Sequence, residues 1–338
     1  MSKKVLFAVA LLVVAAFALT ACAGEQGPPG PAGPEGPQGE QGPAGPAGES
    51  VSMADLTCTE CHNDTTIITD KKFTWETSLH GSGTAAEYAG GRDGCAACHS
   101  GGTFKAMIAA GANPGNYEGD TLGVTHQDCR TCHEIHTTYT SDDWALSTTE
   151  PAVVYAFEGV TFEGGQGNLC ATCHVPRTAF SATDGVVNVT STHWGPHHGP
   201  QAAMLLGVGG AGEVEGKAAG HYSLVEDTCV ACHVGENDNH SFEPDVAACL
   251  DCHADVENFD VNGLQSEIAA LGAELGELLE AKGMYELEAG HPVVGEYPEA
   301  EAAALWNYIY IMVEDKSMGV HNPNYAKALL EASIEALQ

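Results

Sequence analysis

Six copies of a Cys-x-x-Cys-His sequence lie between residues 58 and 253, and they constrain the fold more than any other feature. Their cysteines are Cys58 and Cys61, Cys95 and Cys98, Cys129 and Cys132, Cys170 and Cys173, Cys229 and Cys232, and Cys249 and Cys252. Their histidines are His62, His99, His133, His174, His233 and His253. This spacing attaches c-type haem: the two thiols form thioethers with one porphyrin, and the histidine is the proximal iron ligand. The sequence therefore predicts six covalently bound c-type haems.

The cysteine inventory supports this interpretation. The chain has 13 cysteines, and Cys22 alone lies outside the motifs. No pair is left for a disulfide framework, and a zinc ribbon would not need a histidine after every second cysteine. Both alternatives are therefore much weaker than haem attachment.

The density of motifs predicts the fold class. Residues 58–253 give each motif roughly 33 residues, too few for a separate apolar core around each haem. The 41 glycines and an aromatic content of 7% also favour loops over a densely packed interior. We expect a mainly α multihaem fold with extensive loops, a core dominated by haem, and a C-terminal helical hairpin or bundle.

The first residues predict export. Residues 1–21 resemble a signal peptide, because a basic start precedes an apolar run that is short for a membrane span. Leu19-Thr20-Ala21-Cys22 resembles the lipobox of bacterial lipoproteins, which implies cleavage before Cys22 and its lipidation. An ordinary signal peptide with a chance cysteine is the alternative. We expect an exported protein, lipid-anchored at the outer membrane or cell surface of a bacterium.

Residues 22–50 predict a stalk. Glycine occupies every third position from Gly24 to Gly48, with proline at many of the intervening positions. This period is typical of collagen, in which only glycine fits the crowded axis of three chains. A trimeric rod and a stiff monomeric spacer both remain open, and at about 3.1 Å per residue either would span roughly 80 Å.

The histidines outside the motifs determine whether each haem iron has a second histidine ligand. A haem with two histidine ligands is suited to electron transfer, whereas an open haem can bind a small molecule. Ten of the 16 histidines lie outside the motifs, enough to close every iron. We predict six distal ligands, with His291 and His321 in reserve: His80, His126, His136, His198, His221 and His240. His126 and His221 are chosen for their positions near motifs, whereas His80, His136 and His240 lie in segments that resemble distal-ligand segments of known multihaem cytochromes. The choice of His198 over its neighbours His193 and His197 is nearly arbitrary.

Several segments resemble those of bacterial extracytoplasmic multihaem c-type cytochromes. Trp75-x-x-Ser78-x-His80 is similar to a distal-ligand segment of that group, and His136 completes its Cys-x-x-Cys-His-x-x-His pattern. Residues 319–326 (Gly-Val-His-Asn-Pro-Asn-Tyr-Ala) resemble the C-terminal part of relatives of pentahaem nitrite reductases and hydroxylamine oxidoreductases. Those enzymes mark a catalytic haem by a proximal lysine or a porphyrin crosslink. All six motifs here end in histidine, so nitrite or hydroxylamine chemistry is in doubt.

The haem motifs define a domain over residues 51–260, and residues 261–338 form a helical region. Leu264, Ile268, Leu271, Leu275 and Leu278 make an apolar helix seam. Further helices are expected over 299–314 and from Pro323 onward. The seam predicts either packing within the chain, which we favour, or an oligomer interface.

Charge limits the partners. The formal net charge is −34, so the surface repels nucleic acid. We expect an electron-transfer cytochrome that exchanges electrons with other redox proteins or extracellular acceptors, with a homotrimer or filament as possible assemblies. The alternative is a reductase of nitrogen or sulfur oxyanions with one open haem, for which Arg177 is a weak candidate substrate-binding residue.

Overall fold

The computed structural model describes His62 and residues 66–338. The chain divides into two units, Met1–Ser50 and Val51–Gln338, and all described residues belong to the second. Several sequence predictions fall outside the described residues: the signal peptide, Cys22, the collagen-like segment, and Cys58 and Cys61 of the first motif. Within the described residues, no helix is both long enough and apolar enough to cross a bilayer.

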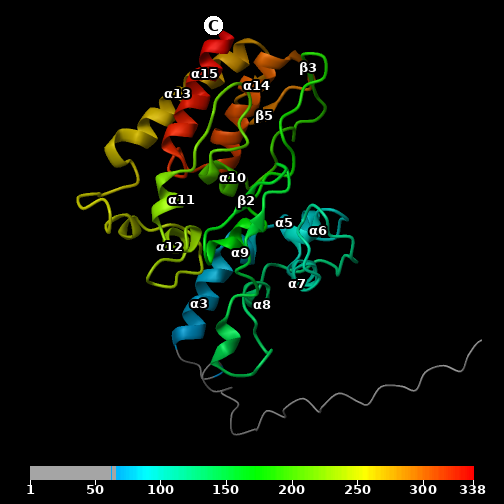
Figure 1. The fold of residues 1–338 in the computed structure, drawn as a ribbon, viewed down its shortest axis with the longest axis vertical. Coiled ribbons are helices and arrows are strands. Elements are labelled where there is room, and N and C mark those ends of the chain that lie inside the picture. The colour runs from blue at the N-terminus through cyan, green and yellow to red at the C-terminus, as the bar shows by residue number, and fades with distance from the viewer. Residues whose placement is uncertain (1–61, 63–65) are drawn as a thin grey trace, which may run out of the picture. The chain divides into compact units, whose positions relative to one another are not determined.

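Short helices joined by loops make up the part of the chain that carries the motifs (Figure 1). The α-helices there are α3 (Thr66–Thr77), α4 (Leu79–Ser82), α5 (Ala85–Ala89), α6 (Ala96–His99), α7 (Gly101–Ala109), α8 (Cys129–Cys132), α9 (Gly167–Ala171), α10 (Gln201–Leu206), α11 (Gly220–Leu224) and α12 (Cys229–His233). Three single turns of 3₁₀-helix are η1 (Ser141–Trp144), η2 (Val246–Cys249) and η3 (Val261–Gly263).

Strands are few and short. Three antiparallel pairs occur in the described residues: β1 (Ala152–Val153) with β2 (Thr161–Phe162), β3 (Val186–Val189) with β6 (Gly295–Pro298), and β4 (Tyr285–Glu286) with β5 (His291–Pro292). The β3–β6 pair joins the haem-motif region to the C-terminal region, with Val186 opposite Pro298. The prediction of a mainly α protein is confirmed.

Helices α13 (Leu264–Ala281), α14 (Glu299–Tyr308) and α15 (Pro323–Leu337) pack against one another after the last motif (Figure 1). A π-helix, η4 (Ile309–Asp315), continues α14. At the start of α15 the Asn322 side chain accepts the backbone N–H of Tyr325, and Pro323 occupies the first turn, where no intrahelical N–H bond is needed.

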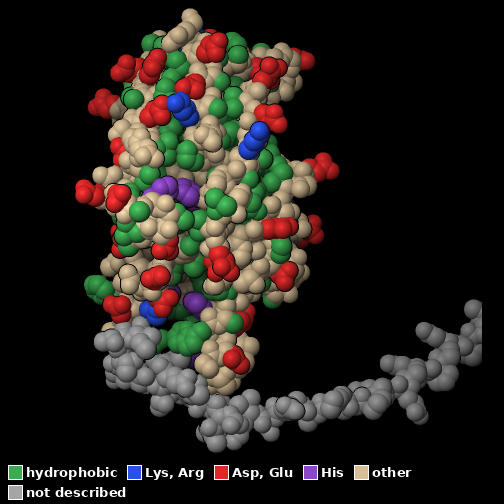
Figure 2. Space-filling view, turned by 60° about the vertical axis from the view of Figure 1, so that its left-hand side comes forward, with side chains coloured by type: hydrophobic (Ala, Val, Ile, Leu, Met, Phe, Trp, Pro, Cys, Tyr) green, Lys and Arg blue, Asp and Glu red, His purple; other side chains and the backbone are tan. Residues whose placement is uncertain are grey.

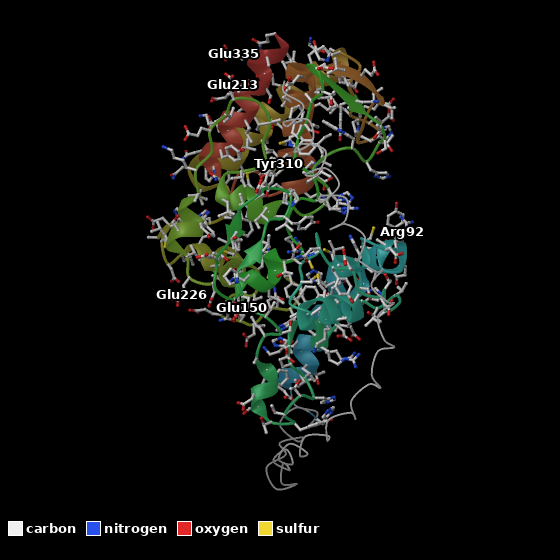
Figure 3. All side chains as sticks on the ribbon, turned by 45° about the vertical axis from the view of Figure 1, so that its right-hand side comes forward. Arg92, Glu150, Glu213, Glu226, Tyr310 and Glu335 are labelled. Carbon is white, nitrogen blue, oxygen red and sulfur yellow. The ribbon has the colours of Figure 1, made fainter. Side chains whose placement is uncertain are left out.

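The largest apolar core lies among these three helices. Ile268, Leu275 and Leu279 of α13 are buried with Leu305 of α14 and with Leu329 of α15. Tyr310 lies in the same core and donates its hydroxyl hydrogen to Val208 O at 2.6 Å (Figure 3). The apolar seam of α13 therefore packs within the chain.

The haem-motif region has much smaller apolar clusters. One is centred on Phe162, Val154 and Ala203, and another on Phe104 and Met107. Some large apolar side chains are instead almost fully exposed, as expected where a bulky apolar group completes the interior: Leu79 is 86% exposed and Leu224 is 85% exposed.

Candidate metal centres

Each described haem motif forms one turn of helix. The histidine N–H donates to the carbonyl of the first cysteine, four residues earlier, at 3.1 Å for His99, 2.9 Å for His133 and His174, and 2.8 Å for His253. In the fifth motif, the whole sequence Cys229–His233 is helical. Because residues i, i+3 and i+4 share one face of a helix, both sulfurs and the imidazole are presented to the same side.

Every motif histidine faces a second histidine from elsewhere in the chain. We number the sites by the order of their motifs. The ring centroids are 6.1 Å apart for His62 and His136 (site 1), 6.2 Å for His99 and His197 (site 2), 6.3 Å for His133 and His240 (site 3), 6.2 Å for His174 and His80 (site 4), 6.4 Å for His233 and His321 (site 5), and 6.4 Å for His253 and His221 (site 6).

This spacing fits one metal ion between each pair. Because a metal-bound imidazole nitrogen lies about 2 Å from the metal and roughly 1.1 Å from its own ring centre, two imidazoles on opposite sides of one metal have centres about 6.2 Å apart. The exposed Leu79 and Leu224 lie in the short helices that carry His80 and His221, where an apolar porphyrin face would cover them. The paired histidines, the paired cysteines and these apolar side chains suit haem.

Comparisons with known proteins agree with this geometry. Residues 46–134 match the family described as cytochrome c7 and related cytochrome c. The matched segment carries the first three motifs, and the later three motifs have the same sequence pattern and the same histidine pairing. The match and the histidine pairs together support a multihaem c-type cytochrome.

A solved structure, that of the outer cell wall cytochrome OcwA, has a similar fold. The TM-score is 0.53 at 23% identity, over 79% of this cytochrome and 50% of OcwA. This cytochrome therefore corresponds to half the length of that chain. A search of curated proteins found no match.

Four of the six predicted distal histidines face a motif histidine: His80, His136, His221 and His240. His126 does not. Its ring contacts Glu87 at 2.8 Å and the backbone oxygen of His80 at 3.3 Å, so it supports the segment that carries His80.

His198 does not face a motif histidine either. Its Nδ1 contacts Glu314 at 2.6 Å, and the preceding His197 faces His99 instead. His197 has φ +75°, a left-handed conformation, and its ring still lies 5.0 Å from that of His198, centroid to centroid. The adjacent His-His sequence gave no signal for which of the two faces His99.

The structure places the reserve candidate His321 opposite His233. The sequence signal for it was the resemblance of residues 319–326, which contain it. The other reserve, His291, lies in β5, 3.8 Å from Glu286. Arg177 lies near site 2, with Nη1 4.0 Å from Cys95 Sγ.

Local hydrogen bonds fix the segment that carries His80. Ser78 caps α4 by accepting the N–H of Gly81, and Trp75 Nε1 donates to Gln127 O at 2.8 Å. A side chain at Gly81 would meet Trp75 O at 2.3 Å. The Trp-x-x-Ser-x-His-Gly sequence is thus a compact frame for one histidine.

Many site histidines use Nδ1 for a hydrogen bond to the protein. The partners are Trp144 O for His133 (2.7 Å), Phe242 O for His233 (2.8 Å), Val320 O for His221 (2.8 Å), Asp238 O for His240 (2.7 Å), Gln201 Oε1 for His174 (3.1 Å) and Asp315 Oδ1 for His321 (2.7 Å). A carbonyl oxygen only accepts, so Nδ1 carries the hydrogen and Nε2 keeps its lone pair for a metal.

Burial keeps several of these imidazoles neutral. It is the main cause that lowers the pKa of His80 to about 4 and that of His197 to about 4, and it also lowers the pKa values of His174 and His133. A neutral imidazole can donate its lone pair to iron, whereas an imidazolium cannot. In contrast, the hydrogen bond with Glu314 raises the pKa of His198.

Proposed function

We propose that the cytochrome carries electrons along six covalently bound haems and catalyses no reaction of its own. The observation that carries this proposal is the set of six histidine pairs, with ring centroids 6.1–6.4 Å apart. Two imidazoles complete the coordination of a haem iron and leave no position for a substrate. Each bound haem would supply one-electron redox chemistry.

Contacts between neighbouring sites support a connected path centred on site 4. The thiol of Cys173 (site 4) is close enough to Cys98 (site 2) to lower its pKa. The Cys170 thiol (site 4) acts on Cys229 (site 5) and lowers its pKa to about 7. Site 4 therefore has sites 2 and 5 as neighbours.

Aromatic contacts and chain proximity supply the remaining links. The Phe242 ring lies 4.9 Å from His80 of site 4 and 5.9 Å from His240 of site 3, centroid to centroid. His133 of site 3 and His136 of site 1 are three residues apart. Cys249 of site 6 contributes to the raised pKa of Cys232 in site 5, after the burial of that thiol. The proposed order is 1–3–4–5–6, with site 2 as a branch at site 4.

The protein's own side chains perform positioning in this scheme. The Nδ1 hydrogen bonds hold the imidazole rings in place, and a fixed pair of ligands requires little rearrangement when an electron arrives. Electron transfer through these sites requires neither a proton donor nor a nucleophile. This arrangement favours electron carriage over the reductase alternative.

We further propose that lipidated Cys22 and the stalk over residues 22–50 hold the cytochrome at the outer membrane or cell surface. The sequence signals support this location, and OcwA is described as an outer cell wall cytochrome. Acidic side chains are scattered over the face seen in Figure 2, with few basic ones. Such a surface suits redox proteins or acceptors with positive charge.

Haem content and carbon monoxide binding test the function. The mass of the purified cytochrome should exceed that of the processed chain by six haems, and the reduced protein should bind no carbon monoxide because no iron has an open position. Fewer than six haems would contradict the count. Stoichiometric carbon monoxide binding to one haem would favour the reductase.

A further inference from the structure

Asp315 stands out among the residues that touch the paired histidines. It ends η4, and its side chain is completely buried. The carboxylate accepts a hydrogen bond from His321 Nδ1 at 2.7 Å, another from the Ser317 hydroxyl, and a third from the Ser317 backbone N–H at 3.3 Å. His321 in turn faces His233 across site 5.

The other sites offer a direct comparison. In residues 66–338, the Nδ1 partners found for His133, His174, His221, His233 and His240 are all neutral oxygens. Asp315 is the one carboxylate that bonds a paired histidine through Nδ1 in that part of the chain. Three other carboxylates contact histidines in the described residues, Glu87 on His126, Glu314 on His198 and Glu286 on His291, but none of these histidines belongs to a pair.

A carboxylate at this place has a predictable effect on a metal centre. By drawing the Nδ1 hydrogen toward itself it raises the basicity of Nε2, so the ligand stabilises the more positive oxidation state of iron. Its negative charge also opposes the addition of an electron, and burial weakens solvent screening of that charge. Both effects lower the reduction potential.

We infer that Asp315 makes site 5, with Cys229, Cys232, His233 and His321, the site of lowest reduction potential. The inference rests on the proposed electron-transfer function and deepens it. Because site 5 lies between sites 4 and 6 in the proposed order, it is a step in energy that an electron must cross in either direction. Through its effect on site 5, Asp315 thus limits the exchange of electrons between site 6 and sites 1 to 4 when the driving force is small.

The same end of η4 also reaches site 4. Gln201 Oε1 accepts from His174 Nδ1, and its amide donates to the backbone oxygen of Glu314 at 3.1 Å. A π-helix is uncommon and often occurs at functional sites. Here the π-helix continues α14, and its last two residues are Glu314, which contacts His198, and Asp315, which contacts His321.

The test is Asp315→Asn in the full haem-loaded cytochrome, because asparagine keeps the shape and an acceptor oxygen but removes the charge. We expect the lowest of the six midpoint potentials to rise by about 59 mV, a tenfold change in the ratio of reduced to oxidised haem for a one-electron couple. The other five should move much less. An unchanged lowest potential would overturn the inference.

Glu314→Gln is the matched control. It removes one negative charge from the preceding residue, whose carboxylate contacts the unpaired His198. The lowest potential should stay in place in this variant. An equal rise in both variants would assign the effect to general charge and overturn the role of the His321 contact.

A measurement on the unaltered protein covers the case in which Asp315→Asn does not assemble. The rings of His233 and His321 are inclined by 40°, whereas sites 2, 4 and 6 have angles of 75–77°. During stepwise reduction, the last ferric paramagnetic resonance signal to disappear should belong to the less inclined class. A last signal from the near-perpendicular class would overturn the inference. If the proposed function were wrong, the spectrum of the fully oxidised protein, recorded before any reduction, would show a missing or high-spin haem.

Discussion

Replacing His197 should open one haem in six, and replacing its neighbour His198 should open none. The ring of His197 lies 6.2 Å from that of His99, whereas His198 is 68% exposed and bonds Glu314. Glycine is the suitable replacement for His197 because φ is +75° there, a conformation that glycine adopts without strain. His197→Gly therefore removes the ligand with little effect on the backbone.

The size of each effect follows from these contacts. In His197→Gly, site 2 keeps His99 alone, so carbon monoxide should bind one sixth of the haem in the reduced protein. In His198→Ala, the haem spectrum should be unchanged, but the largely buried Glu314 carboxyl loses its partner, which costs roughly 1–3 kcal/mol of stability.

The assay is a carbon monoxide titration of both variants after their haem content has been confirmed by mass. If His198→Ala bound carbon monoxide and His197→Gly did not, the assignment of the two histidines would be reversed. If neither variant bound it, another group would close site 2 and the pairing argument would fail there.

Two further predictions concern the fold. Gly207→Ala should lower the melting temperature more than Gly212→Ala. Gly207 has φ +73° and Gly212 has φ +87°, so alanine at either position costs about 1–2 kcal/mol of backbone strain. Only at Gly207 would the new Cβ also meet the backbone, at 2.4 Å from Lys217 O. Equal losses would contradict the close approach of Lys217 O to Gly207, which follows the last residue of α10. Burial raises the pKa of Tyr310 well above its usual value of about 10, so its contribution to stability is complete below that pH and is lost as the pH rises further. Thermal unfolding between neutral and alkaline pH should therefore show a steeper decline for the unaltered protein than for Tyr310→Phe, and identical profiles would contradict this reasoning.

The parts of the structure that depend on local sequence were predictable. A Cys-x-x-Cys-His turn brings its own three side chains to one side, and the apolar spacing of α13 defines a buried face without reference to the rest of the fold. The helix start at Pro323 follows from the same local chemistry. His136 was predicted because, three residues after His133, it completes the Cys-x-x-Cys-His-x-x-His pattern of similar cytochromes.

The ligands that come from distant segments were harder to predict. His321 lies far along the chain from His233, and only the fold brings them together. His197 faces His99 from a left-handed backbone conformation, φ +75°, which two adjacent histidines in the sequence do not predict. The π-helix η4 likewise has no sequence signature, because the α-helical pattern of α14 runs into it without interruption.

Low-temperature electron paramagnetic resonance of the oxidised cytochrome, integrated against total haem, tests the central claim most directly. The account predicts six low-spin haems in two classes. Sites 2, 4 and 6, with ring angles of 75–77°, should give strongly anisotropic signals, because perpendicular imidazoles leave two iron d orbitals nearly equal in energy. Sites 1, 3 and 5, with angles of 25–40°, should give rhombic signals. A high-spin signal that integrates to one haem in six would contradict the account and reveal an open iron.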